Sequence, residues 1–69
     1  MLTNKQIIAH LLDEYGSRDS AMFDSTGDGI CLECGNIQSG VEPDAEGYHC
    51  NECNADAVCG IEGVIITYL

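Results

Sequence analysis

The chain has 69 residues and carries 12 acidic side chains against two basic ones, which gives a formal net charge of −10. A chain this short buries only about 60% of its unfolded surface, so its apolar core needs a covalent or metal cross-link for stability. The charge argues against direct binding of nucleic acid and against adhesion to anionic membranes, because both need clustered cations. The sequence shows neither an apolar run of roughly 18 residues nor a secretion signal, so we expect a cytoplasmic location.

The first segment, residues 1–18, is predicted to contain an amphipathic helix over residues 3–15. Thr3 followed by Gln6 resembles a capping box, and Gly16 suits the position just after a helix. His10 is expected on a face of this helix. A helix of about 12 residues is marginal alone in water, so its apolar stripe either packs on the rest of the chain or forms a homodimer or partner surface. The stripe consists of Ile7, Ile8, Leu11, Leu12 and Tyr15.

Residues 19–28 are interpreted as an acidic linker without regular structure. Serine, aspartate and glycine dominate this part of the chain. Its one apolar patch, residues 21–23, could anchor the linker to the core.

Residues 29–69 are predicted to form a domain of short strands around two cysteine pairs. Strands are expected over residues 29–31 and 36–39, and again over residues 47–50 and 56–59, with a turn-rich connection over residues 40–46. Residues 63–69 are β-branched and apolar, which predicts a final strand. A helical turn that begins near Ile61 and Glu62 is the alternative, because a short apolar run fits the hydrophobic period of a helix as well as that of a strand.

Four of the five cysteines form two C-x2-C pairs separated by 15 residues: Cys31, Cys34, Cys50 and Cys53. This spacing is typical of zinc sites, because each tight turn aims two sulfurs at one metal and two turns complete a tetrahedral site. Four protein ligands leave no position for water or substrate, so the sequence predicts one structural Zn²⁺ and no catalytic site. The predicted fold class is a small metal-stapled α+β protein, a zinc ribbon with an N-terminal amphipathic helix.

Other interpretations of the cysteines stay open. A disulfide framework would need an oxidising compartment, a rubredoxin-like site would hold iron, and a redox-active pair would need only one C-x2-C motif. Cys59 is expected to be a small buried hydrophobe on a strand, with a substitute ligand or a reactive thiol as alternatives. His49 alternates with Cys50 along a strand and is expected at the surface or half-buried.

The cysteine segment resembles the small zinc-ribbon proteins of phage and prophage genomes. The resemblance covers about residues 29–62 and depends on three stretches: residues 40–48, the second cysteine pair at 50–53, and residues 57–60. This sequence departs from the pattern at Cys59, where the family has tyrosine. The resemblance implies a zinc-ribbon fold in a phage or bacterial cytoplasmic setting, and it implies no particular activity.

The distribution of charge separates the functional hypotheses. Lys5 and Arg18 balance Asp13 and Glu14, whereas residues 19–69 carry ten acidic side chains and no lysine or arginine. The sequence therefore favours a non-enzymatic adaptor or regulator that binds the basic surface of a protein partner. A nucleic-acid mimic that occupies the binding groove of another protein is the alternative, and a rubredoxin-like electron carrier is a third hypothesis.

Overall fold

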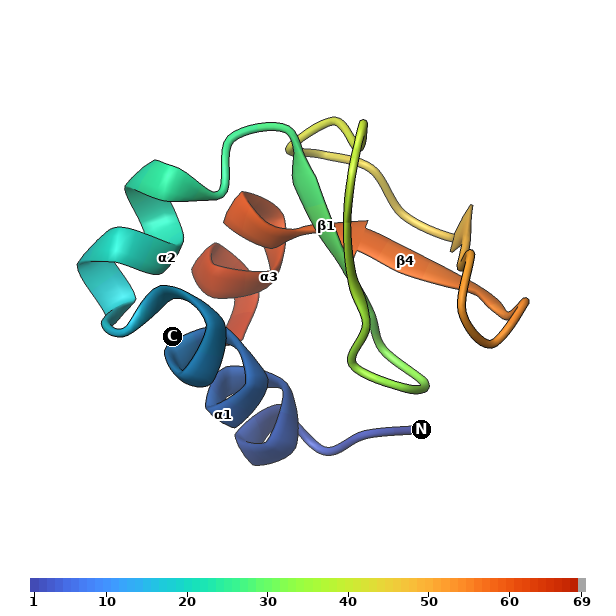
Figure 1. The fold of residues 1–69 in the computed structure, drawn as a ribbon, viewed down its shortest axis with the longest axis horizontal. Helices are drawn as coiled ribbons and strands as arrows, with labels where there is room; N and C mark the ends of the chain where they lie inside the picture. The colour runs from blue at the N-terminus through green and yellow to red at the C-terminus, as the bar shows by residue number, and fades with distance from the viewer. Residues whose placement is uncertain (69) are drawn as a thin grey trace.

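The helical half of the protein lies on one side of a small antiparallel sheet (Figure 1). The computed structural model describes residues 1–68. Its helices are α1 (Asn4–Tyr15), α2 (Arg18–Asp24) and α3 (Ile61–Tyr68). Its strands are β1 (Asp28–Cys31), β2 (Ile37–Ser39), β3 (Tyr48–His49) and β4 (Asp56–Gly60). The protein is thus a small α+β fold, as the cysteine spacing and the N-terminal pattern predicted.

Helix α1 begins and ends where the sequence predicted. The Thr3 hydroxyl accepts a hydrogen bond from the Gln6 backbone N–H at 3.2 Å, and the Gln6 side chain accepts one from the Thr3 N–H at 2.9 Å. Ile7 and Leu11 are buried in the core, which confirms that the stripe packs on the rest of the chain. A homodimer through this stripe would therefore have to use Leu12, which is 38% exposed.

Helix α2 occupies the segment that was interpreted as an unstructured linker, so that interpretation was wrong. The Ser17 hydroxyl caps the helix by accepting the Ser20 N–H at 3.2 Å, and Asp19 places a carboxylate in the first turn. Ala21 from the apolar patch is buried in the core, whereas Phe23 is 76% exposed. Local capping, the buried Ala21 and the partly buried Met22 connect this short helix to the core.

The final strand predicted for residues 63–69 is wrong, because the described residues of this segment belong to helix α3. The alternative prediction, a helical turn that begins near Ile61, is confirmed. Ile61, Val64 and Ile65 lie at i, i+3 and i+4 and are all buried, so the helical period buries one face against the core. Residue 69, the end of the predicted strand, lies outside the described residues. Within residues 1–68, no helix is both long and apolar enough to span a membrane.

The sheet separates two clusters of buried side chains. Its strand order is β2-β1-β4-β3, and neighbouring strands are antiparallel. Ile30 pairs with Cys59 and Cys31 pairs with Val58 in the register of β1 and β4. Because side chains alternate along a strand, Ile30 faces the helices while Cys31 and Val58 face the other side. One cluster therefore joins the helices to the sheet, and the other surrounds the cysteines.

Candidate metal centre

The four cysteines of the two C-x2-C pairs come together at one end of the sheet. Their sulfur atoms all lie within 4.8 Å of one another, a group that could hold a metal ion. The Sγ atoms of Cys31 and Cys53 are 3.6 Å apart, and those of Cys34 and Cys50 are 3.7 Å apart. A tetrahedral ion with metal–sulfur bonds of about 2.3 Å sets its sulfurs about 3.8 Å apart, so the donor set fits such an ion. No disulfide links the five cysteines of the described residues.

Both cysteine pairs lie in tight turns with the same backbone hydrogen bond. The Gly35 N–H donates to the Cys31 carbonyl at 2.8 Å, and the Asn54 N–H donates to the Cys50 carbonyl at 3.0 Å. Each donor closes its turn with a positive φ, 81° at Gly35 and 65° at Asn54. Glycine adopts this conformation without steric cost, and asparagine tolerates it better than most residues. The two turns therefore share the same local backbone geometry.

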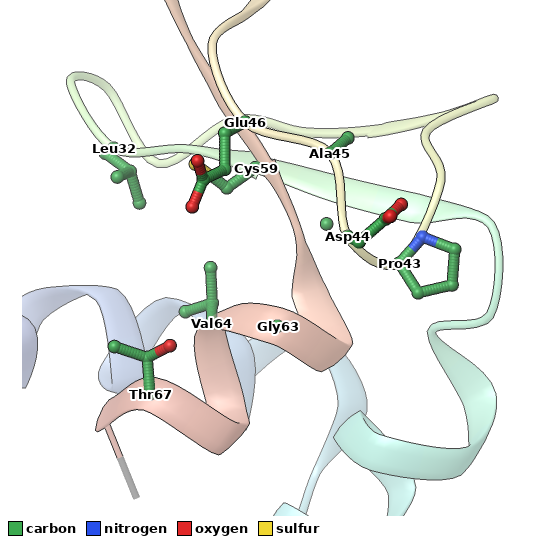
Figure 2. Close-up of a pocket in the computed structure, with 10 residues that line it drawn as sticks. Leu32, Pro43, Asp44, Ala45, Glu46, Cys59, Gly63, Val64 and Thr67 are labelled. Atoms are coloured by element: carbon green, nitrogen blue, oxygen red, sulfur yellow. The ribbon is translucent and has the colours of Figure 1, made fainter.

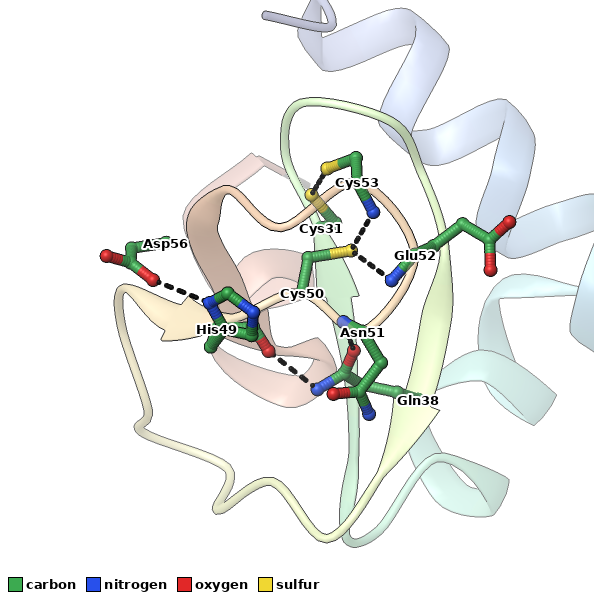
Figure 3. Close-up of polar contacts among 8 residues, drawn as sticks. All are labelled: Cys31, Gln38, His49, Cys50, Asn51, Glu52, Cys53 and Asp56. Carbon is green, nitrogen blue, oxygen red and sulfur yellow. Dashed lines mark hydrogen bonds and ion pairs between the residues drawn. The ribbon is translucent and has the colours of Figure 1, made fainter.

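Backbone N–H groups point at the sulfurs from inside these turns, as Figure 3 shows for Cys50 in the second turn. The Glu33 N–H donates to the Cys31 sulfur at 3.4 Å, and the Glu52 N–H donates to the Cys50 sulfur at the same distance. The Cys53 N–H makes a second bond of 3.4 Å to the Cys50 sulfur. Hydrogen bonds to an anion favour its charged form, so the turns are built to stabilise thiolates.

The surroundings of the clustered thiols lower the pKa of one cysteine and raise the pKa of another. The backbone N–H groups of Cys53 and Glu52 lower the pKa of the Cys50 thiol to about 6, although burial acts in the opposite direction. The backbone bond from Asn36 favours the thiolate of Cys34, but burial and bonds from neighbouring thiols raise the pKa of Cys34 to about 12. A metal ion that binds four thiolates must therefore displace the proton that Cys34 holds at neutral pH.

The site is buried on one side and open on the other. Cys31 and Cys50 have no exposed surface, whereas Cys34 is half-buried and Cys53 is exposed. Chelators and exchanging ions can therefore approach from the side of Cys53.

Gln38 contributes to the site in a way that the sequence did not indicate. Its side chain extends from β2 and donates to the His49 carbonyl at 3.1 Å, while its amide oxygen accepts the Asn51 N–H at 3.1 Å (Figure 3). These two bonds hold both flanks of Cys50. The contact depends on the pairing of strands far apart in the sequence, so no local pattern could have revealed it.

Cys59 and His49 lie outside the sulfur cluster. Cys59 is on β4 as expected, but it is only half-buried and it faces the helical cluster. His49 is exposed as expected, and its Nδ1 atom lies 3.1 Å from the Asp56 carboxylate. The sheet therefore prevents Cys59 from acting as a substitute ligand, because it holds this thiol on the face opposite Cys31.

Helix α1 and the residues before it contact the first cysteine turn. The Leu2 N–H, which precedes the helix, donates to the Leu32 carbonyl at 2.8 Å. The His10 ring lies so close to Gly35 that a Cβ atom there would be 2.6 Å from its Nε2 atom. His10, which was expected on a face of the helix, is exposed, and its ring contacts the first turn of the candidate metal centre.

Comparisons with known proteins found no matching family model, no matching curated protein and no matching solved structure. The geometry of the site and the distribution of charge are therefore the features that indicate a function.

Proposed function

We propose that the four clustered cysteines bind one Zn²⁺ ion and that this ion is structural. The observation that carries the proposal is the closed set of four sulfurs, all within 4.8 Å of one another. Four protein ligands leave no coordination position for a substrate, so the protein would be a zinc ribbon without catalytic activity. Bound zinc contributes roughly 10–16 kcal/mol in comparable small sites, which is larger than the stability that a core of this size supplies.

Iron is the alternative ion for this donor set, because tetrahedral thiolate suits both metals. An absorbance spectrum of the purified protein separates them. A colourless protein supports zinc, whereas visible thiolate-to-iron bands would support the electron-carrier hypothesis and contradict a structural zinc ribbon.

We further propose that the protein is an adaptor or regulator that binds the basic surface of a protein partner. Of the ten acidic side chains in residues 19–69, eight are exposed. Ion pairs within the protein neutralise little of this charge. Among the described residues, two acidic side chains of this segment are paired, Glu33 with the Met1 amino group and Asp56 with His49, and both pairs lie at the surface. Four thiolates and one divalent ion would add a further charge of −2.

The resemblance of residues 29–62 to zinc-ribbon proteins of phages and prophages supports a bacterial cytoplasmic setting for this activity. A zinc site of four thiolates needs reduced cysteines, which is the state expected in a reducing compartment. The adaptor would then meet its partner inside a bacterial cell.

Affinity capture from a bacterial lysate, with the metal-loaded protein as bait and a salt gradient for elution, tests the adaptor. We expect a protein with a basic surface to be retained at low salt and released as salt rises. Absence of any retained protein at low salt would contradict the proposal. Competition with DNA for the captured protein then tests the nucleic-acid mimic. If the captured protein binds DNA and this protein at the same time, mimicry is excluded.

A further inference from the structure

A cavity of about 340 Å³ lies between β4, the first turns of α3 and the loop over residues 43–46 (Figure 2). It is separate from the sulfur cluster, because Cys59 lines it from the helical face of the sheet. The volume is at the lower end of ligand-binding pockets, which suits one extended side chain better than a whole cofactor.

The loop that forms the outer wall is fastened to the strand and the helix by backbone hydrogen bonds. The Gly60 N–H donates to the Ala45 carbonyl at 3.0 Å, and the Gly63 N–H donates to the Pro43 carbonyl at 3.3 Å. Two glycines allow this close approach, since neither has a side chain to push the loop away. These backbone hydrogen bonds therefore fix the outer wall of the cavity relative to β4 and α3.

The lining of the cavity combines an aliphatic wall with carboxylates. Leu32, Ala45 and Val64 supply apolar surface, while Asp44 and Glu46 are exposed acidic residues at its edge. Figure 2 shows the Glu46 carboxylate directed toward Val64 across the cavity. Residues 19–69 contain no lysine or arginine that could neutralise these carboxylates.

We propose that this cavity receives a lysine or arginine side chain of the partner protein. Such a side chain pairs an aliphatic stem with a cationic head, so its stem would lie along the apolar wall and its head would meet Glu46. The inference rests on the proposed function, because it names the contact through which the acidic protein holds a basic partner.

Cys59 provides a reporter at this site, because it is the thiol of the described protein that lines the cavity and lies outside the sulfur cluster. Metal-loaded protein is equilibrated with cystamine or with the disulfide of 2-mercaptoethanol, which differ mainly in the charge of the attached group. The Cys59 thiolate attacks one sulfur of the probe, a new S–S bond forms, the other half leaves as a thiolate, and the Cys59 proton passes to solvent. Intact-mass measurement gives both the adduct and the retained metal, and Cys59→Ser controls for reaction at the other cysteines.

We expect the cationic adduct to be favoured about 2- to 5-fold over the neutral one at low salt, which is the range for a partly exposed ion pair. Glu46→Gln should reduce this preference at least about twofold, whereas Glu14→Gln makes the same charge change on α1 and should leave it intact. Equal preferences in these two variants would overturn the proposal, because the excess would then reflect net charge alone. Failure of Cys59 to react with either probe would also overturn it, since the cavity would be closed.

The two proposals fail separately. If a basic partner is captured and Glu46→Gln does not change its affinity, the adaptor function is supported and the cavity is not the contact. If cystamine is preferred in a Glu46-dependent way but no partner is captured, the cavity is supported and the adaptor function is contradicted.

Discussion

Replacement of Gly60 by alanine tests how the loop over residues 42–46 is held against β4 and α3. A Cβ atom at Gly60 would overlap the carbonyl oxygens of Glu42 and Pro43 and would lie 2.6 Å from the Pro43 carbonyl carbon. Ordinary contacts between carbon atoms begin at about 3.5 Å, so the loop would have to move by about 1 Å. These neighbours are backbone atoms, which cannot rotate away as a flexible side chain would.

The expected destabilisation has two sources. Overpacking of this kind costs about 1–3 kcal/mol. Movement of the loop would also weaken the backbone bonds from Gly60 to Ala45 and from Gly63 to Pro43, each with a net value of about 0.5–1.5 kcal/mol. We therefore expect Gly60→Ala to lower the free energy of unfolding of the metal-loaded protein by about 2–5 kcal/mol, and its Tm by at least about 10 °C.

Denaturant unfolding followed by circular dichroism measures this loss, with Gly40→Ala as the matched control. Gly40 has a φ of +77°, and a Cβ atom added there would meet nothing within 4 Å, so its substitution carries only the conformational cost of about 1–2 kcal/mol. If the two variants lost the same free energy of unfolding, or if Gly40→Ala lost more, tight packing of Gly60 against the backbone of Glu42 and Pro43 would be refuted.

Individual contacts elsewhere in the molecule can be tested one at a time. The Tyr15 hydroxyl donates to the Asp28 carboxylate at 2.8 Å, and burial raises the pKa of Tyr15 above its ordinary value of 10.0. Because the folded-state pKa is the higher one, this contribution is fully present below pH 10 and is lost as the pH rises above it. Tyr15→Phe should cost about 1 kcal/mol at pH 7 and flatten the alkaline part of a stability–pH curve; an unchanged alkaline slope would contradict this. Gln38→Ala removes both bonds that flank Cys50 and should speed loss of metal to a chelator about tenfold, whereas an unchanged rate would show that the turn needs no such support. Removal of the metal should abolish the amide-exchange protection of α1 as well as that of the cysteine turns, since His10 packs on the first turn; full protection of α1 without metal would contradict this coupling.

The elements that the sequence predicted well are those specified by local chemistry. Helix α1 has its own capping box and C-terminal glycine, and the cysteine turns have residues that tolerate a positive φ at Gly35 and Asn54. Each of these features forms from neighbours within a few residues. For the same reason, the spacing of the cysteine pairs was sufficient to identify the group that the fold brings together.

The elements that were predicted wrongly depend on packing between distant segments. The run from Ile61 has β-branched residues, which favour a strand, but its helical face completes the core formed by α1, α2 and Ile30. Tertiary packing overrides local propensity there. Helix α2 was missed because its composition is polar, and a serine cap with one buried alanine, Ala21, gives only a weak signal.

The cavity beside Cys59 could not be predicted for a related reason. It forms where the loop over residues 43–46 meets β4 and α3, and its existence requires α3 to be a helix. A strand at that position would have placed Val64 and Thr67 elsewhere. The alternation of side chains on β4, which separates Cys59 from the metal ligands, likewise requires the observed register with β1.

Native mass spectrometry after equilibration with Zn²⁺ tests the central claim most directly. We expect one metal ion per chain in the wild-type protein and in Cys59→Ser, and loss of that ion in the double variant Cys34→Ser/Cys53→Ser, which removes one ligand from each turn. Metal retained by the double variant, or lost from Cys59→Ser, would contradict the assignment of Cys31, Cys34, Cys50 and Cys53 as the metal centre.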